Sequence, residues 1–139
     1  MNTSFLSDMN WLAVLVAAVA YFMLGALWYS LLFSKIWIQG SGIDPNQPGA
    51  KKGAGGIMAM TFLLEAITCI GLGILVYRLA LTGAMSGIKL GLLTGVCFSA
   101  ISICISFLYQ MKPKSLIAVD MGYHIVGNII AAVILCIWQ

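Results

Sequence analysis

Four long runs of apolar residues dominate the pattern along the chain: residues 11–33, 57–77, 88–109 and 116–138. A helix needs about 20 mostly apolar residues to cross a hydrocarbon core ~30 Å thick, and each run meets that length. The runs are continuous and do not alternate between apolar and polar residues, which excludes the strands of a membrane β-barrel. The sequence therefore predicts an all-α integral membrane protein, a bundle of four transmembrane helices.

The polar segments between the runs leave no room for a separate soluble domain, so we expect a single membrane domain over residues 1–139. The longest of these segments, residues 34–56, contains Pro45, Pro48 and several glycines, a composition typical of a flexible connector. Residues 34–39 at its start could instead continue the first helix into the membrane interface.

The distribution of lysine and arginine predicts the orientation of the helices. Segments 34–56 and 110–115 lie on the same side of the bilayer, and the other side has only Arg78 and Lys89. Cationic residues in short loops favour the cytoplasm, so we expect both segments to be cytoplasmic and both termini to lie outside. The cations of the two segments are Lys35, Lys51, Lys52, Lys112 and Lys114.

The first run also contains Ala18-Val19-Ala20, which imitates the cleavage site of a signal peptide. No basic residue precedes the run, and apolar sequence continues to Phe33, which is longer than the apolar region of a signal peptide. We therefore expect a retained first helix and not a cleaved leader.

Composition supports the membrane assignment. The chain is 62% hydrophobic and 8% charged, whereas a soluble domain has about 25% charged residues. So few charges cannot cover a surface that faces water, which excludes a cytosolic enzyme, a disordered tail and a secreted disulfide scaffold. The net charge of +3 is scattered between the apolar runs and forms no basic face, so a nucleic-acid partner is excluded as well.

The third run has a small residue at every fourth position: Gly87, Gly91, Gly95 and Ser99. Residues four apart lie on one face of a helix, so this stripe forms a groove that another helix backbone can approach closely. The groove suits packing within one chain and equally a seam between two copies. Four spans leave much helix surface for partners, so we expect a homo-oligomer or a partner membrane protein.

Ionisable residues inside a bilayer are expensive, and they point to function. The second and fourth runs contain three of them, Glu65, Asp120 and His124, and Asn128 continues the four-residue spacing of Asp120 and His124 along one helix face. Glu65 and His124 lie at a similar depth, about 12 Å from the same side, so the two side chains can pair. The remaining helices place three more polar or aromatic residues near this depth: Trp28, Tyr29 and Ser102.

Two interpretations of this polar cluster stay open. In the first, a carboxyl group beside an imidazole forms a site that protons or cations can reach, because histidine exchanges a proton near neutral pH. In the second, the side chains only satisfy one another's hydrogen bonds and set the helix register. A metal site built from Glu65, His124 and Asp120 is conceivable, but one histidine with carboxylates is an unspecific ligand set.

No sequence pattern indicates catalysis or a cofactor. No serine is accompanied by a nucleophile elbow or a second histidine, so we expect neither an enzyme nor a bound cofactor. The cysteines lie within the apolar runs without a Cys-x-x-Cys pair, which favours structural thiols over a redox or zinc site. They are Cys69, Cys97, Cys104 and Cys136.

Two segments carry a resemblance to a known family. The opening Asn-Trp-Leu-Ala-Val-Leu-Val-Ala-Ala of residues 10–18, with Leu-Gly-Ala-Leu-Trp-Tyr-Ser at 24–30, resembles the bacterial family Domain of Unknown Function 1761. The segment Asp-Met-Gly-Tyr-His at 120–124 is similar to that family's Gly-Tyr-His motif, although the family usually has Asn at the position of Asp120. The resemblance implies a small four-span membrane protein and no established activity. The matching residues are Trp11, Gly25, Trp28, Tyr29, Gly122, Tyr123 and His124.

These observations lead to two functional hypotheses. The first is an oligomeric, channel-like transporter for a small solute or for protons, in which Glu65 and His124 line a cavity that water reaches. The alternative is an accessory or structural subunit of a larger membrane complex. Either protein is expected to lie in the bacterial inner (cytoplasmic) membrane as a multi-pass protein.

Overall fold

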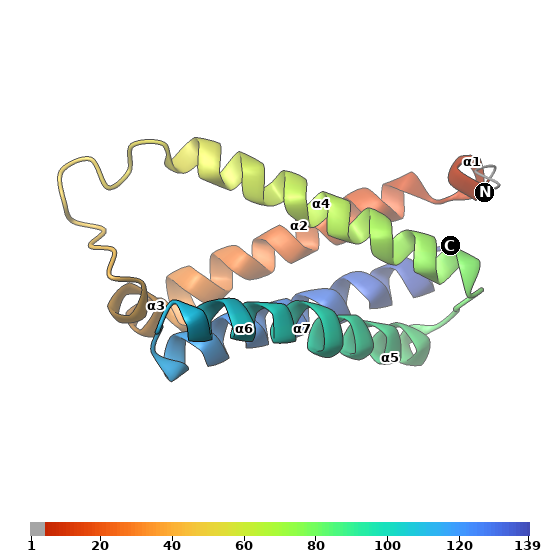
Figure 1. Cartoon of the computed structure of the whole chain (residues 1–139). Helices are drawn as coiled ribbons and strands as arrows, with labels where there is room; N and C mark the ends of the chain where they lie inside the picture. The colour runs from red at the N-terminus through yellow and green to blue at the C-terminus, as the bar shows by residue number, and fades with distance from the viewer. Residues whose placement is uncertain (1–4) are drawn as a thin grey trace.

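The computed structural model describes residues 5–139, and all regular secondary structure in this range is helical. The helices form an elongated bundle in which α1 and the C-terminus lie at one end, here called the terminal end (Figure 1). The opposite end, the loop end, carries the connection between α3 and α4 and the turn between α6 and α7. The elements are α1 (Phe5–Asp8), α2 (Trp11–Leu27), η1 (Trp28–Leu32), α3 (Ser34–Ser41), α4 (Ala54–Arg78), α5 (Ala84–Thr94), η2 (Gly95–Ala100), α6 (Ile101–Tyr109) and α7 (Lys114–Ile137).

Four helices among the described residues are long and apolar enough to cross a membrane, which confirms the all-helical four-span fold. The first combines α2 with η1, and the third combines α5, η2 and α6 into one continuous helix. Three spans begin before their apolar runs, and in two of them positive backbone φ angles at Gly53 (82°) and Gly83 (80°) end the preceding turns. The four spans are Trp11–Leu32, Ala54–Arg78, Ala84–Tyr109 and Lys114–Ile137.

Helix α7 lies at the centre of the bundle, where it contacts α2, α4 and the α5–η2–α6 helix. The small-residue stripe of the third span makes the closest of these approaches. A Cβ atom placed on Gly87 would lie 2.5 Å from the Cα atom of Val133, and one on Gly91 would lie 2.3 Å from the Cα atom of Ile129. The glycine groove therefore holds the backbone of α7 within one chain.

The segment expected as a connector, residues 34–56, is partly helical. Phe33 leaves the helical conformation (φ −127°, ψ 21°) and separates the first span from α3. Gly40 of α3 packs against Leu116 of α7, and a Cβ atom at Gly40 would lie 2.8 Å from the Leu116 Cβ atom. This contact packs one side of α3 against the bundle. Because α3 ends at Ser41 and α4 begins at Ala54, residues 42–53 form the connection between them.

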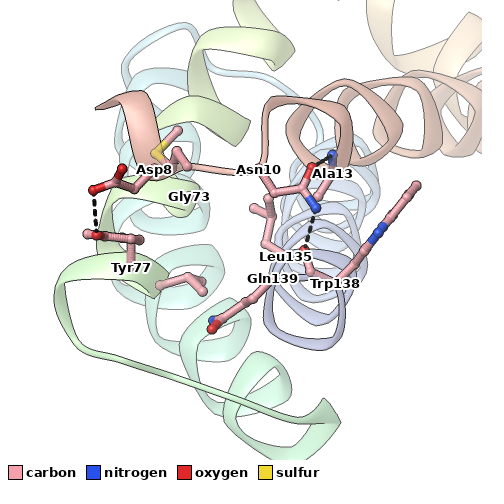
Figure 2. Close-up of a pocket in the computed structure, with 10 residues that line it drawn as sticks. Asp8, Asn10, Ala13, Gly73, Tyr77, Leu135, Trp138 and Gln139 are labelled. Atoms are coloured by element: carbon pink, nitrogen blue, oxygen red, sulfur yellow. Dashed lines mark hydrogen bonds between the residues drawn. The ribbon is translucent and has the colours of Figure 1, made fainter. Parts of the chain in front are cut away.

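The first and last spans are joined at the terminal end of the bundle. The Asn10 side chain caps α2 by accepting a hydrogen bond from the Ala13 amide (3.0 Å), and its Nδ2 donates to the Trp138 carbonyl (3.4 Å). The Tyr77 hydroxyl of α4 donates to the Asp8 carboxylate (3.3 Å). Figure 2 shows these groups around a cavity of about 260 Å³.

Candidate functional site

Two cavities in the described part of the chain share a wall at the middle of the bundle. The larger, about 480 Å³, is lined by residues of α2, α4 and α7 together with η2 and α6. The smaller, about 390 Å³, lies between α2 and α4. We call them the large cavity and the small cavity. Four residues line both of them, Tyr29, Thr61, Glu65 and Tyr123.

Glu65 is the acidic residue of this shared wall. It projects from α4, and only 6% of its surface is exposed. The Tyr123 hydroxyl donates a hydrogen bond to Oε1 of Glu65. The second carboxyl oxygen, Oε2, is buried without a hydrogen-bond partner among the described residues. Because a buried polar atom without a partner is costly, Oε2 marks a place where a proton, a water molecule or a ligand would be held.

Glycines make room for the tyrosine rings around Glu65. A Cβ atom on Gly25 of α2 would lie 2.9 Å from the Tyr123 hydroxyl oxygen, and one on Gly127 of α7 would lie 2.0 Å from Cε2 of Tyr21. The two rings themselves meet edge to face, with centroids 5.4 Å apart. The aromatic part of the site therefore depends on one glycine from each of these two helices.

A second carboxyl–tyrosine pair lies beside the first, towards the loop end. Tyr29 donates to the Asp120 carboxylate (2.8 Å), and its ring lies 5.2 Å from the Tyr123 ring. Tyr29 belongs to η1, a π-helical turn in which the Phe33 amide bonds the Trp28 carbonyl five residues back. Such π-helical turns are frequent at functional sites. Trp28 anchors the turn by donating its indole N–H to the Val119 carbonyl (3.0 Å).

His124 and Asn128 belong to a separate chain of hydrogen bonds on the other side of Tyr21. The Tyr21 hydroxyl lies 2.9 Å from Nδ1 of His124, and Asn128 donates to that same hydroxyl (3.2 Å). Asn128 also donates to Ser99 (3.4 Å) and accepts from Thr94 (3.2 Å). Asn128 is 2% exposed and has partners for both its amide oxygen and its amide nitrogen, so it acts as a structural link between α2, α7 and the third span.

The structure places Glu65 and His124 on the wall of the same large cavity but bonds them to different tyrosines. The expected Glu65–His124 pair is thus replaced by Glu65–Tyr123 and His124–Tyr21. The physical reason is the helical geometry of α7, in which consecutive residues point about 100° apart. Tyr123 points towards α4, and its long side chain reaches Glu65, whereas His124 turns towards Tyr21 of α2.

Ser102 does not join the cluster. It is exposed, and its hydroxyl donates to the Phe98 carbonyl of its own helix (2.6 Å). Ser99 takes that place, because the stripe of Gly87, Gly91 and Gly95 continues to it along the face that meets α7. Trp28, Tyr29, Asp120 and Asn128 all lie at or next to the site.

Sequence reasoning did not single out Tyr21 and Tyr123 for the polar cluster, although both contribute its central hydroxyl groups. Each is at most 5% exposed. The available signal was a tyrosine inside an apolar span, because a buried hydroxyl group in lipid needs a hydrogen-bond partner. Hydrophobic periodicity does not show this signal, since it counts tyrosine among the apolar residues.

The described residues contain no group of three or more His, Cys, Asp and Glu side chains placed to hold a metal ion. The cysteine thiols are free, with Cys69 and Cys136 buried and Cys97 exposed. The chemistry of the site is therefore that of two carboxyl groups, one imidazole and three phenols.

Comparison with known protein families identifies the family to which the chain belongs. The model of the family described as "Protein of unknown function (DUF1761)" matches residues 12–136. The chain belongs to this family. No curated protein and no solved structure matches it. The DUF1761 match includes Tyr21, Glu65, Asp120, Tyr123 and His124, and with its four apolar spans this DUF1761 protein is a multi-pass membrane protein.

Proposed function

We propose that this DUF1761 protein is a small-solute or proton-linked transporter in which Glu65 is the exchange group. The observation that carries the proposal is the Glu65 carboxyl, with one oxygen held by Tyr123 and the other buried without a partner, between two cavities. A carboxyl that is needed only for packing would have both oxygens satisfied, as Asn128 does at the same site.

The shared wall suits a group that exchanges between two compartments. Tyr29, Thr61 and Tyr123 separate the cavities together with Glu65, and they come from three different spans. Rotation of the two tyrosine rings would expose Glu65 to one cavity or to the other. Glu65 would then take up a proton or a solute from one cavity and release it into the other.

His124 fits the same role on the side of the large cavity. Its ring lines that cavity, and Nδ1 lies 2.9 Å from the Tyr21 hydroxyl. An imidazole exchanges protons with water near neutral pH. His124 would therefore carry protons between water in the large cavity and the phenols around Glu65.

The orientation and location of the protein belong to the same proposal. We assign the loop end to the cytoplasm, because its connections carry Lys51, Lys52 and Lys112. The membrane would be the bacterial inner membrane. The α5–η2 glycine groove is already occupied by α7, so an oligomer would associate through other helix surfaces.

Proton uptake into proteoliposomes tests the proposal. Vesicles containing the purified protein and a pH-sensitive dye receive an inside-negative potential from potassium and valinomycin. We expect internal acidification with the wild-type protein and none above empty vesicles with Glu65→Gln. The matched control is Asp44→Asn, because Asp44 is an exposed loop carboxyl that accepts a hydrogen bond from the Asn46 amide (2.9 Å), and an asparagine side chain can accept the same bond.

Acidification by Glu65→Gln at the wild-type rate would contradict the role of Glu65. Equal and negligible uptake by all three proteins, at equal incorporation, would contradict proton transport and favour an accessory subunit of a larger complex.

A further inference from the structure

The small cavity combines aromatic and apolar walls with one acidic group. The rings of Phe22, Tyr29 and Tyr123 line this cavity. Met58 adds a flexible apolar side chain, and Glu65 is the one acidic residue in the lining. A volume of about 390 Å³ lies within the range of small-molecule sites, roughly 300–1,000 Å³. Such sites are mostly apolar with a few placed polar groups, and this cavity has that character.

The charge of the lining selects the sign of the ligand. All seven Lys and Arg residues of the chain lie in the described part, and none of them lines the small cavity. An anion would meet the Glu65 carboxyl without a compensating cation. A cation would supply the counter-charge that a carboxylate inside a bilayer requires, at the unpartnered Oε2 atom.

The aromatic walls select an organic cation over a metal ion. The Tyr29 and Tyr123 rings lie 5.2 Å apart and nearly edge to face, and Phe22 is held by an edge-to-face contact with Phe62 at 5.7 Å. Aromatic faces attract ammonium groups within about 6 Å of the ring centre. Calcium and magnesium instead need about six or more oxygen ligands, and the described residues form no cluster of that kind here.

We propose that the small cavity binds a monovalent organic cation, a tertiary or quaternary amine with apolar substituents, whose charge lies at Glu65. Its substituents pack against Phe22 and Met58, and the rings of Tyr29 and Tyr123 surround the ammonium group. The inference rests on the proposed function, since it names the solute class that Glu65 exchanges for a proton.

The large cavity differs in a way that suits release of such a cation. Its lining lacks Phe22 and Met58 and includes the polar Thr68, Ser99 and His124 beside the apolar Leu64 and Ile103. These polar side chains favour water over an apolar substituent. The small cavity is therefore the binding side of the shared wall, and the large cavity is the hydrated side.

Equilibrium dialysis in detergent micelles tests the inference without requiring transport. The probe is radiolabelled benzyltrimethylammonium, and the competitors are unlabelled benzyltrimethylammonium, neutral benzyl alcohol and anionic benzoate. We expect saturable binding with one site per chain, displaced by the unlabelled cation and by neither of the other two compounds. Glu65→Gln should abolish it, whereas Asp44→Asn should bind like the wild-type protein.

Two further variants separate binding from folding. Glu65→Asp keeps the charge and should retain measurable affinity, whereas Glu65→Gln should lose it at an unchanged gel-filtration profile. Phe22→Leu removes one aromatic face and should weaken binding roughly 2- to 30-fold. No saturable binding by the wild-type protein, full binding by Glu65→Gln, or equal displacement by benzoate would each overturn the inference.

The result of the binding experiment does not depend on whether the protein transports protons. Glu65-dependent proton uptake in vesicles without cation binding would retain the proposed transporter and reject the organic cation as its solute. Cation binding without proton uptake, both in vesicles without the cation and in vesicles loaded with benzyltrimethylammonium for exchange, would retain the binding site and reject the transport function.

Discussion

Glu65 and Asn128 show how two buried polar side chains of the same bundle differ in their hydrogen bonds. Asn128 has hydrogen-bond partners on the first and third spans, and one oxygen of Glu65 has none among the described residues. The second interpretation of the sequence, a purely structural network, describes Asn128 well. It does not explain the unpartnered Oε2 atom of Glu65, so we expect substitutions at Glu65 and at Asn128 to have different effects.

Tyr123→Phe should destabilise the protein by about 1 kcal/mol, because it removes the hydrogen bond to Glu65 and leaves both carboxyl oxygens unpartnered. Unfolding by titration with sodium dodecyl sulfate in mixed micelles measures the change. Tyr109→Phe is the matched control, since Tyr109 is 89% exposed and should show no effect. Equal stability of the two variants would argue against the Glu65–Tyr123 bond.

His124→Asn distinguishes a structural imidazole from one that carries protons. The asparagine amide places a polar atom near the position of Nδ1, so the bond with Tyr21 can persist, but it cannot exchange protons. We expect unfolding free energy close to that of the wild-type protein and proton uptake in vesicles reduced roughly 10-fold or more. Unchanged uptake would assign His124 to the structural network alone.

At the scale of elements, the antiparallel pair of α5–η2 and α7 holds the bundle together. Gly87, Gly91 and Gly95 admit the α7 backbone at Val133, Ile129 and Ile125, one contact for each helical turn. Such close approach stabilises membrane helices through van der Waals packing, because lipid supplies no hydrophobic force between them. The same contact sets the rotation of α7 and hence the directions of Tyr123 and His124.

Gly91→Ala should destabilise the bundle by about 1–3 kcal/mol, because the added methyl group would lie 2.3 Å from a backbone atom that cannot move aside. Gly71→Ala is the matched control, since nothing lies within 4 Å of a Cβ atom there. Unfolding in mixed micelles compares the two. A Gly91→Ala protein as stable as Gly71→Ala would contradict the α5–α7 interface.

At the scale of the whole molecule, α4 packs on α2 and α7 but is separated from the third span by cavities. Figure 1 shows α4 diverging from α6 towards the loop end. The smaller of the cavities on this side, about 300 Å³, is lined by apolar side chains together with three hydroxyl groups that have hydrogen-bond partners: Leu72, Leu75, Phe98, Thr68, Thr94 and Ser99. A buried polar atom inside a membrane bundle requires water or a partner, and Glu65 Oε2 on the wall of the large cavity has no partner among the described residues, so we expect this side of α4 to be hydrated.

Cysteine accessibility measures that hydration. In a Cys97→Ser, Cys104→Ser background, Thr61→Cys lies on the shared wall, and Leu63→Cys lies two residues away on a surface that is 53% exposed. We expect a charged, membrane-impermeant methanethiosulfonate to label Thr61→Cys in vesicles and to spare Leu63→Cys, which faces lipid. The reverse order of labelling would contradict a water-filled cavity at Glu65.

The number and type of the spans follow from the sequence by itself, because a run of about 20 apolar residues has one stable state in a bilayer, a helix that satisfies its own backbone. The sequence by itself also places Glu65, Asp120 and His124 inside those spans, because each lies within an apolar run. Helix ends are less well predicted, since Gly53, Gly83 and Phe33 set them through backbone angles that apolarity does not report.

The partners of the polar residues were decided only by the tertiary structure. Spacing placed Asp120, His124 and Asn128 on one face, but the close approach at Gly91 and Gly95 determines where that face points. Equal depth allowed Glu65 to meet His124 or Tyr123, and the rotation of α7 selected Tyr123. Depth is a property of position along the chain, whereas contact depends on how one helix is rotated against another, and packing between helices sets that rotation.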